Sequence, residues 1–453
     1  MAKYQKYAEY KDSGVEWLGE IPNDWEMWKL SHAYTEIGSG TTPSTSNEEN
    51  FEGNIPWVTT GELRENLILD TKKKVSQRTI EQFPTLKKYP IGSVAIAMYG
   101  ATIGRLGIFG IEATTNQACC VMTTSKVLNN KYVFYWLQAF KNEIIQLSSG
   151  GGQPNINQEK VASLKISAPF FEDQINIANF LDYETAQIDT LIAKQEKLIE
   201  LLKEKRQAVI SHAVTKGLNS DVAMKDSGVE WLGRVPEHWE ILKFDYAINT
   251  VSDIDHYMPS SVDVGIPYIM TGDLKDFVSD IDFESCKQVA YSDYQKLSRK
   301  IKTTKDDIIF ARYATIGTLS YVDIDKEFLV SYSCVTIKSN SNRTTGKYLS
   351  YYLKSQAFLQ AIQQQINSNT QGNVGVDSLR NVKIILPLLS EQENIIEFLQ
   401  AELIKMDNLI NKAESAIQLM QERRTALISS AVTGKIDVRN WQHPNEAKTE
   451  LSL

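Results

Sequence analysis

The chain has 453 residues, of which 42% are hydrophobic and 23% charged. These proportions are ordinary for a soluble globular protein of roughly two to four domains. The net charge of −8 argues against a free-standing nucleic-acid-binding protein. The four cysteines have no CxxC spacing and the five histidines are scattered, so neither a disulfide framework nor a zinc site is expected.

Charge is distributed unevenly along the chain. Residues 1–170 carry 17 basic and 17 acidic side chains, and residues 225–385 carry 18 and 20. The excess of acidic side chains lies in two other segments. Residues 171–224 carry 6 basic and 9 acidic side chains, and residues 386–453 carry 7 basic and 10 acidic ones. Any affinity for DNA must therefore come from local basic patches or from partners. No apolar stretch reaches the roughly 20 residues that span a bilayer, so we expect a reduced, cytoplasmic protein with no membrane partner.

The N-terminal segment opens an internal repeat. KDSGVEWLGEIPNDWEMWKL at 11–30 recurs as KDSGVEWLGRVPEHWEILKF at 225–244, with 13 of 20 positions identical. Weaker matches follow, among them MYGATIGRLG at 98–107 with ARYATIGTLS at 311–320. Self-similarity over such a length predicts two copies of one structural unit.

Each repeat begins with a stretch of about 160 residues of mixed character. Short β-branched and aromatic runs, such as Val94–Met98 and Ile308–Phe310, are separated by Gly, Pro and Asn. This pattern predicts a globular α/β (α+β) domain with short strands. The string Asn54-Ile55-Pro56-Trp57 resembles the Asn-Pro-Pro-aromatic loop of adenine methyltransferases, but its second residue is wrong, so we interpret it as the entry to a strand.

Each repeat ends with a long helix, predicted over roughly 173–214 and 391–432 and following Pro169 and Pro387. Apolar positions recur every seven residues in both helices, a pattern typical of a coiled coil. They are Ile188, Gln195, Leu202 and Val209 with Leu191 and Leu198 alongside, and Met406, Ala413, Met420 and Leu427 with Ile410 and Ile417 alongside. An amphipathic helix packed on its own domain is the alternative. Duplication favours two helices that pair antiparallel as a spacer with approximate two-fold symmetry.

The expected organisation has five parts. They are a first target recognition domain at 1–168, a helical spacer at 169–218, a second recognition domain at 219–386, a second helical spacer at 387–437 and a tail at 438–453. The helices repeat closely, whereas 38–54 and 64–90 barely match 249–265 and 275–305. One scaffold carrying two different recognition surfaces explains this contrast.

Candidate DNA-binding residues in the first domain combine hydroxyls, cations and amides on loops. Such groups can bond base edges or phosphates. They are Thr41 and Thr42, the cluster Lys72, Lys73, Lys74 and Arg78, the loop residues Tyr99, Thr102 and Arg105, and Gln153 and Asn155. A plain surface turn or a solvated charged face is the alternative for each group.

The second domain offers corresponding candidates. They are Lys296, Arg299, Lys300 and Lys302, the loop residues Arg312, Tyr313 and Thr315, and Gln371 and Asn373. The two basic clusters occupy equivalent points of the divergent regions, which favours phosphate contact. We expect no catalytic residue and no metal site, since the chain also lacks the GxxxxGK[ST] loop of an ATP-driven motor.

The DSGVEWLGxIPxxW opening and the PxxxEQxxIxxFL and ERRxALISxAVTGKID helix motifs resemble the specificity subunits of type I restriction-modification systems. The resemblance covers nearly the whole chain, except the tail after about Arg439. It implies that each domain reads one half of a bipartite target in double-stranded DNA. It also implies helices that set the spacing and dock two copies of a DNA adenine methyltransferase subunit.

The resemblance places the chemistry on the partners. S-adenosylmethionine, ATP and Mg are expected on the methyltransferase subunits and on a motor and endonuclease subunit, and no cofactor is expected on this chain. Two other functions stay open on the sequence alone. One is a coiled-coil scaffold protein without a DNA role, and the other is an enzyme, such as a fused DNA methyltransferase.

Overall fold

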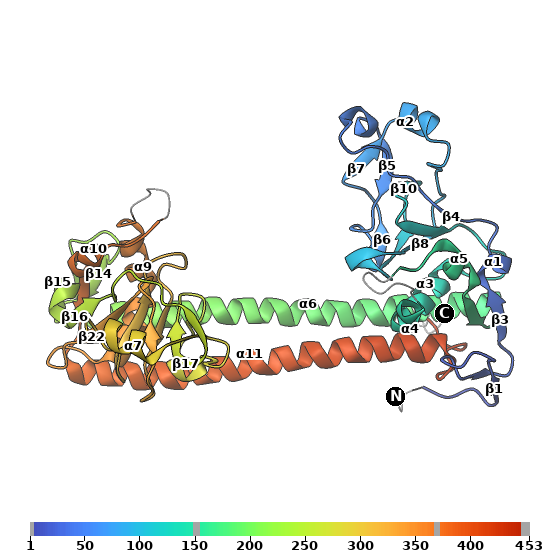
Figure 1. Cartoon of the computed structure of the whole chain (residues 1–453). Coiled ribbons are helices and arrows are strands. Elements are labelled where there is room, and N and C mark those ends of the chain that lie inside the picture. The colour runs from blue at the N-terminus through green and yellow to red at the C-terminus, as the bar shows by residue number, and fades with distance from the viewer. Residues whose placement is uncertain (1–3, 148–154, 367–371, 445–453) are drawn as a thin grey trace. The chain divides into compact units, whose positions relative to one another are not determined.

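A computed structural model describes residues 4–147, 155–366 and 372–444, and the chain divides into two compact units. Unit 1 consists of residues 1–195 and 415–453, and unit 2 of residues 196–414. Each unit holds one globular domain and one end of each of two long helices (Figure 1). We call the globular part before residue 171 head 1, and the part between residues 217 and 388 head 2.

A five-stranded sheet forms the centre of head 1. Its strands follow the order β4 (Ile37–Ser39), β11 (Cys119–Met122), β8 (Val94–Ala97), β9 (Leu106–Phe109) and β6 (Asn66–Ile68). Neighbouring strands are antiparallel, except the parallel pair β6 and β9. Every residue of β8, β9 and β11 is buried, and for this reason the sequence shows continuous apolar runs here instead of alternation.

Smaller elements surround this sheet. A three-stranded sheet joins β10 (Thr114–Thr115), β5 (Ile55–Val58) and β7 (Lys73–Val75); β1 (Tyr10–Asp12) pairs with β2 (Glu20–Pro22), and β3 (Glu26–Lys29) with β12 (Lys165–Ala168). The short helices are α1 (Leu30–Ala33), α2 (Gln77–Gln82), α3 (Asn130–Ala139), α4 (Lys141–Gln146), α5 (Gln158–Ser163), η1 (Glu48–Phe51) and η2 (Gly100–Thr102). Asn54 directly precedes β5, as expected for a strand entry.

Head 2 has a similar arrangement, but its central sheet has four strands where that of head 1 has five, among the described residues. Its central sheet has the order β16 (Ile248–Ser252), β22 (Cys334–Ser339), β19 (Ile308–Ala311) and β20 (Leu319–Tyr321), and its second sheet β18 (Lys287–Val289), β17 (Ser261–Ile269) and β21 (Leu329–Val330). The outer pairs are β13 (Met224–Asp226) with β14 (Arg234–Pro236) and β15 (Glu240–Lys243) with β23 (Lys383–Leu386). The short helices are η3 (Phe244–Ala247), η4 (Val278–Asp280), α7 (Tyr291–Leu297), α8 (Gly346–Leu353), α9 (Gln356–Gln363) and α10 (Val376–Asn381). The mixture of helices and strands fits the α+β class.

The two long helices are α6 (Phe171–Lys216) and α11 (Leu389–Val432), which confirms the predicted helices to within two residues at each end. Gly217 directly follows α6 with φ +80°, and Gly434 follows α11 with φ +69°. Glycine adopts this left-handed conformation without the steric penalty of a Cβ, so both helices end where the sequence supplies one.

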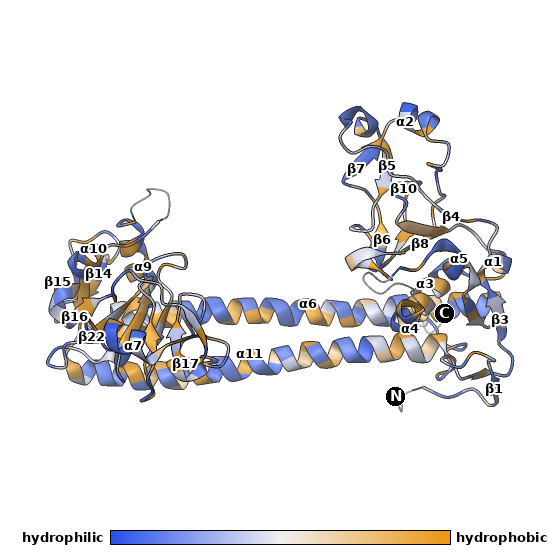
Figure 2. Cartoon of the chain, in the orientation of Figure 1, coloured by the Kyte–Doolittle hydropathy of each residue, from blue (hydrophilic) through white to orange (hydrophobic). Residues whose placement is uncertain are grey.

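Both long helices contribute to the core of each head. In unit 1 the start of α6 and the end of α11 are packed into the core, where Phe180 and Val432 are fully buried. In unit 2 the end of α6 and the start of α11 do the same through Val214 and Leu399. Apolar and polar residues alternate along both helices (Figure 2). The helices are therefore anchored by tertiary packing at both ends.

An ion pair joins α6 to α11 in each unit. In unit 1 Arg424 Nε lies 2.9 Å from Asp189 Oδ1, and in unit 2 Arg206 Nη1 lies 2.5 Å from Asp407 Oδ1. The pairs are equivalent by the repeat, since Arg206 recurs as Arg424 and Asp189 recurs as Asp407, each 218 residues later. The two helices thus lie side by side within each unit.

The apolar seam expected from the seven-residue spacing is only partly buried. Ile188 in unit 1 and Leu202, Met406 and Ala413 in unit 2 are buried. By contrast Leu191 and Leu198, which the sequence placed alongside the seam, are 48% and 41% exposed. A pair of helices covers one narrow stripe on each member, so apolar residues beside that stripe stay at the surface.

The segment after α11 belongs to the core of unit 1. Ile436 and Val438 are buried, and the ring of Trp441 lies 5.7 Å from that of Phe180. The N–H of Asp437 donates to the carbonyl of Gln5 at 2.8 Å, so the two terminal segments pair with each other. All four cysteines are buried and unpaired. None of the helices in the described ranges contains an apolar segment that could span a lipid bilayer.

Candidate nucleic-acid interface

In head 2 the loop between β19 and β20 meets the segment around Asn373. Tyr313 and Asn373 form an isolated antiparallel bridge, and the N–H of Val374 donates to the carbonyl of Arg312 at 3.1 Å. The exposed Thr315 lies on the same loop. Candidates from two separate stretches of sequence therefore share one surface.

Head 1 has the same arrangement between β8 and β9. Tyr99 and Asn155 form the corresponding bridge, and the N–H of Ile156 donates to the carbonyl of Met98 at 2.8 Å. Thr102 is half-buried at the end of the loop's short helix η2. The bridge thus joins two separately predicted candidates in each head.

The loop of head 1 is one residue longer than that of head 2. Ala97 donates to the carbonyl of Arg105, eight residues further on, whereas Ala311 donates to that of Thr318, seven residues further on, both at 2.8 Å. A gapless comparison of the sequences pairs Met98 with Ala311. The hydrogen bonds instead show that Met98 corresponds to Arg312, the residue after Ala311. Sequence comparison failed here because the extra residue lies inside the matching loop itself.

With the corrected correspondence, the arginine of each loop lies at a position where the other loop has an uncharged residue. Arg312 of head 2 corresponds to Met98 of head 1, and Arg105 of head 1 corresponds to Thr318 of head 2. The two loops therefore share their aromatic and hydroxyl residues but not their cation. Each head has its own distribution of positive charge at this loop.

A buried carboxylate gathers three basic side chains beside the head 2 loop. Asp253, 9% exposed, accepts from Arg312 Nη2 at 2.5 Å and from Lys300 Nζ at 3.0 Å, and it bonds His256 Nε2 at 3.0 Å. The His256 ring stacks on Tyr332, with centroids 5.1 Å apart. Asp253 thus connects the basic segment after α7 to the loop after β19.

Burial and charge act on Asp253 in opposite directions. Burial favours the neutral carboxyl and raises its pKa, but the hydrogen bonds from His256 and Lys300 and the charge of Arg312 outweigh it, so the pKa lies below its usual value. The carboxylate is therefore ionised at neutral pH and holds its basic neighbours. By strand register the corresponding residue of head 1 is Ser39. This network is particular to head 2.

The other basic candidates of head 2 lie on and after α7. Lys296 Nζ lies 5.4 Å from the ring centroid of Tyr257, and Lys302 Nζ lies 3.4 Å from Glu327 Oε1. Arg299 is exposed. Lys296 and Lys302 thus lie near aromatic or acidic neighbours, whereas Lys300 alone reaches Asp253 among the four candidates.

In head 1 the hydroxyl loop lies against the three-stranded sheet. The Thr41 carbonyl accepts from Trp57 Nε1 at 3.1 Å, and Trp57 on β5 is paired with Lys73 on β7. Lys73 Nζ lies 4.7 Å from the ring centroid of Phe51. The structure thus brings the threonine group and the lysine group of head 1 together. The remaining candidates here are the half-buried Thr42, the exposed Lys72, Lys74 in an ion pair with Asp70, and Arg78, 3.9 Å from Glu49.

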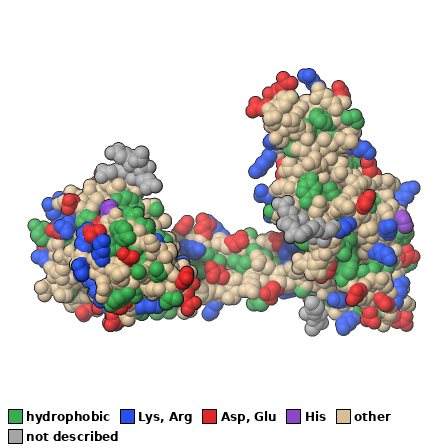
Figure 3. Space-filling model, viewed as in Figure 1, with side chains coloured by type: hydrophobic (Ala, Val, Ile, Leu, Met, Phe, Trp, Pro, Cys, Tyr) green, Lys and Arg blue, Asp and Glu red, His purple; other side chains and the backbone are tan. Residues whose placement is uncertain are grey.

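Basic and acidic side chains are interspersed on the face of each head seen in Figure 3. Neutral heads of this kind fit recognition by particular contacts better than attraction by a large positive field. Gln153 and Gln371, also predicted to bind DNA, lie outside the described residues. DNA contact by the described candidates remains a prediction.

Sequence reasoning missed Asp253, His256 and Tyr332. A search for DNA-binding groups selects cations, amides and hydroxyls, so an aspartate is passed over, and its lysine and arginine partners lie far from it in sequence. Asp253 and Arg312 are 59 positions apart. Only a comparison of the repeats position by position, which pairs Asp253 with Ser39, could have marked it.

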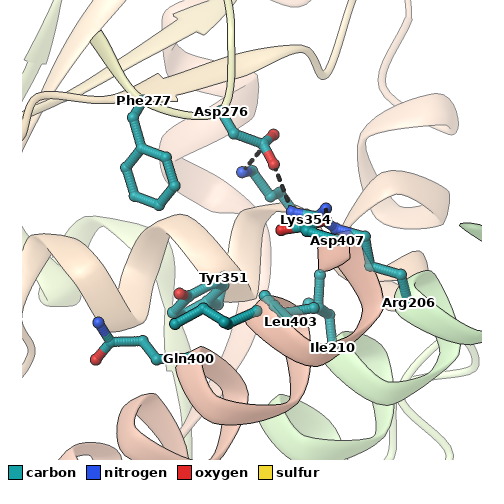
Figure 4. A pocket seen from close by; sticks show the side chains of 10 residues that line it. Arg206, Ile210, Asp276, Phe277, Tyr351, Lys354, Gln400, Leu403 and Asp407 are labelled. Carbon is teal, nitrogen blue, oxygen red and sulfur yellow. Dashed lines mark hydrogen bonds and ion pairs between the residues drawn. The ribbon is translucent and has the colours of Figure 1, made fainter. Parts of the chain in front are cut away.

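A second candidate for ligand binding is a cavity of about 210 Å³ in unit 2. Figure 4 shows Asp276 between two cations, with Oδ1 2.8 Å from Lys354 Nζ and Oδ2 2.7 Å from Arg206 Nη2. Burial lowers the pKa of Lys354. Because each cation has a carboxylate partner, the cavity offers no uncompensated charge to a ligand. Its residues instead join both long helices to head 2.

Comparison with known proteins identifies the family to which the chain is similar. The model of the type I restriction modification DNA specificity domain matches residues 22–201 and 259–419. The MjaVIII specificity subunit of a type I restriction enzyme from Methanocaldococcus jannaschii is 23% identical, over 93% of this chain and 95% of its own length. The EcoKI specificity subunit from Escherichia coli is 21% identical, over 74% of this chain and 71% of its own length.

Two solved structures share the fold. A chain from a study of complex assembly and conformational transition of the type I R-M system has a TM-score of 0.68 at 13% identity, and covers 92% of this chain and 99% of its own. The HsdS subunit from Thermoanaerobacter tengcongensis has a TM-score of 0.51 at 13% identity, and covers 92% and 98%.

Proposed function

This chain belongs to the family of type I restriction-modification DNA specificity proteins, and we propose that each of its heads reads one half of a bipartite DNA target. The observation that carries the proposal is one fold used twice with different surfaces. The bridge between the loop tyrosine and the asparagine recurs in both heads. The residues around that bridge differ, with Ser39 and Met98 in head 1 where head 2 has Asp253 and Arg312. Two heads with the same fold but different surfaces are suited to bind two half-sites of different sequence.

The long helices would set the distance between the half-sites as an antiparallel coiled coil. The mirrored ion pairs Arg424–Asp189 and Arg206–Asp407 support this role, because each joins α6 to α11 within its own unit. A straight helix of 46 residues would be about 69 Å long at the usual rise. That length exceeds the roughly 34 Å of one turn of DNA.

Two equivalent exposed apolar sites, one at Phe170 and one at Leu388, support the binding of two copies of one protein partner. We call them the apolar corners. Phe170, which precedes α6, and Leu388, which precedes α11, are each 71% exposed. Each follows a proline and borders a cavity, and the two cavities are lined by equivalent positions of the two repeats. Exposed apolar side chains that recur in both units suit a partner that binds twice.

The partner we propose is a DNA adenine methyltransferase subunit, one copy per unit. In this assembly S-adenosylmethionine would be held by the methyltransferase, and ATP and Mg by a separate motor and endonuclease subunit. This chain would recognise DNA and perform no chemistry. A coiled-coil scaffold without a DNA role and a fused methyltransferase are the competing functions.

Selection of bound DNA tests the proposal. The chain, co-purified with its methyltransferase partner, is incubated with a random double-stranded library, and the retained DNA is sequenced. The expected result is a consensus of two defined half-sites separated by a fixed undefined gap. No enriched sequence would favour the scaffold. Methyl transfer by the isolated chain with S-adenosylmethionine would favour the fused enzyme.

Mutation of both apolar corners tests the docking proposal. Phe170→Ser should reduce the number of bound methyltransferase copies from two to one, and Leu388→Ser should do the same. The double variant should lose both, as measured by the mass of the complex in solution. Leu69→Ser, at a similarly exposed apolar residue of head 1, is the control. An unchanged mass of the double variant would contradict the assignment of these corners.

A further inference from the structure

Asp253 joins two candidate DNA-binding groups of head 2 directly and a third through Arg312 and Tyr313. Its carboxylate bonds Lys300 from the basic segment and Arg312 from the β19–β20 loop. Arg312 in turn stacks on Tyr313, 4.7 Å from its ring centroid, and Tyr313 bridges to Asn373. A continuous set of contacts therefore runs from a surface lysine to both loops.

The side chains of this set differ in burial, so that some are held in the interior and others are accessible to a ligand. The side chains of Arg312 and Asp253 are 9% and 11% exposed, whereas those of Lys300 and His256 are 43% and 56% exposed. A buried carboxylate with several charge-assisted bonds restricts each cation to a few orientations. The second acidic neighbour of Lys300, Asp255, is 3.8 Å away and 70% exposed, so it restrains the lysine less.

We propose that Asp253 is the positioning residue of the DNA-reading surface of head 2. It presents Lys300 to a DNA phosphate and, through Arg312, fixes Tyr313 and Asn373 beside the base edges. This inference rests on the proposed function of the heads and extends it to one residue. Head 1, with Ser39 and Met98 at the corresponding positions, orders its loop without such a network, so the effect belongs to one half-site alone.

The proposal predicts opposite effects on specific and non-specific binding. Loss of the carboxylate frees the cations, so the ordering that favours the correct base pairs is lost. At the same time a negative charge disappears beside a phosphate backbone, which favours binding to any DNA. A residue that only stabilised the fold would weaken both kinds of binding when it is replaced.

The test compares Asp253→Asn with wild type by the same DNA selection, using the full chain with its methyltransferase partner. Discrimination at one half-site should fall about tenfold, the effect of one lost base contact, and the other half-site should be read as before. Affinity for random DNA should stay equal or rise. Asp323→Asn is the control, since it makes the same charge change in head 2 at a carboxylate that bonds Ser279 instead.

A second variant covers the case in which Asp253→Asn fails to fold. Asp253→Ser with Arg312→Met installs the pair found in head 1 and leaves no unpaired charge in the interior. It should melt near the wild-type temperature and show the same loss at one half-site. Asn155→Ala in head 1 should impair the other half-site, which assigns the heads to the halves.

The outcomes separate the two proposals. A wild-type complex that selects no bipartite target overturns the proposed function. If the wild-type complex selects a bipartite target and folded Asp253 variants read both half-sites as well as wild type does, the role of Asp253 is overturned but the proposed function is not. Equal loss at both half-sites in folded variants also overturns it.

Discussion

Ala314 has a backbone conformation that alanine seldom adopts. Its φ is +55°, in the left-handed region, and the position matches Gly100 of head 1, whose φ is +78°. The extra Cβ of an L-residue is strained there, whereas glycine is not. The strained residue lies beside Tyr313 in the candidate reading loop, where it is exposed. Sequence alone suggested a repeated loop, and the torsion angle identifies the strained position.

Ala314→Gly is expected to stabilise the chain by up to about 1 kcal/mol, because relief of the strain outweighs the added freedom of the unfolded state. Gly100→Ala should destabilise it by a similar amount. A Cβ at Gly100 would meet no atom within 4 Å, so the backbone alone is responsible. Urea unfolding measures both. Destabilisation by Ala314→Gly would contradict the argument.

The carboxylate of Asp253 makes stability depend on acid pH. Its pKa is lowered in the folded state, so its contribution is present above the unfolded value of about 3.9 and is lost as pH falls below it. Between pH 5 and pH 3 the melting temperature of wild type should fall about 2–4 °C more than that of the Asp253→Ser, Arg312→Met variant. Calorimetry across this range measures the difference. Parallel curves for the two proteins would show that the carboxylate makes no such contribution.

At the scale of elements, each long helix was recognisable because its signals are local. Proline before the helix, seven-residue spacing along it and glycine after it all lie within the segment itself. The side that each helix buries was harder to predict, since Leu191 and Leu198 are exposed while Leu202 is buried. Burial depends on which neighbour covers the helix, and each end of α6 enters the core of a different unit.

The two interhelical ion pairs should differ in strength. Arg206 forms ion pairs with both Asp276 and Asp407, whereas Arg424 forms one with Asp189 alone in the described part of the chain, and the two arginine side chains are similarly exposed, at 25% and 27%. Arg206→Met leaves two neighbouring carboxylates and should cost about 1–2 kcal/mol, but Arg424→Met should cost less than about 1 kcal/mol. Urea unfolding of the matched variants compares them. Equal losses would show that the network around Asp276 adds nothing to the pair.

At the scale of the molecule, the proposed spacer can be shortened in register. Removal of 193–199 from α6 and of 411–417 from α11 deletes one seven-residue repeat from each and preserves the pattern of apolar positions. Each helix becomes about 10.5 Å shorter, which corresponds to about 3 base pairs. DNA selection should return the same two half-sites with a gap shorter by that amount.

Deletion of three residues from each helix is the matched control for this experiment. It breaks the seven-residue register, so the pairing of the helices and the binding of DNA should both be impaired. An unchanged gap after the seven-residue deletion would contradict the role of the helices as a spacer, while leaving the reading role of the heads intact.

The duplication, the two long helices and the mixed character of the heads could be predicted from the amino-acid sequence, because repeats, periodicity and helix-ending residues are properties of continuous segments. The contacts of Tyr99 with Asn155 and of Tyr313 with Asn373 became visible in the folded chain, as did those of Asp253 with Arg312 and Lys300. The hydrogen bonds of the folded chain also shifted the residue correspondence between the β8–β9 loop and the β19–β20 loop by one position. Contacts between segments dozens of residues apart depend on strand order and register, which no local pattern of residues encodes.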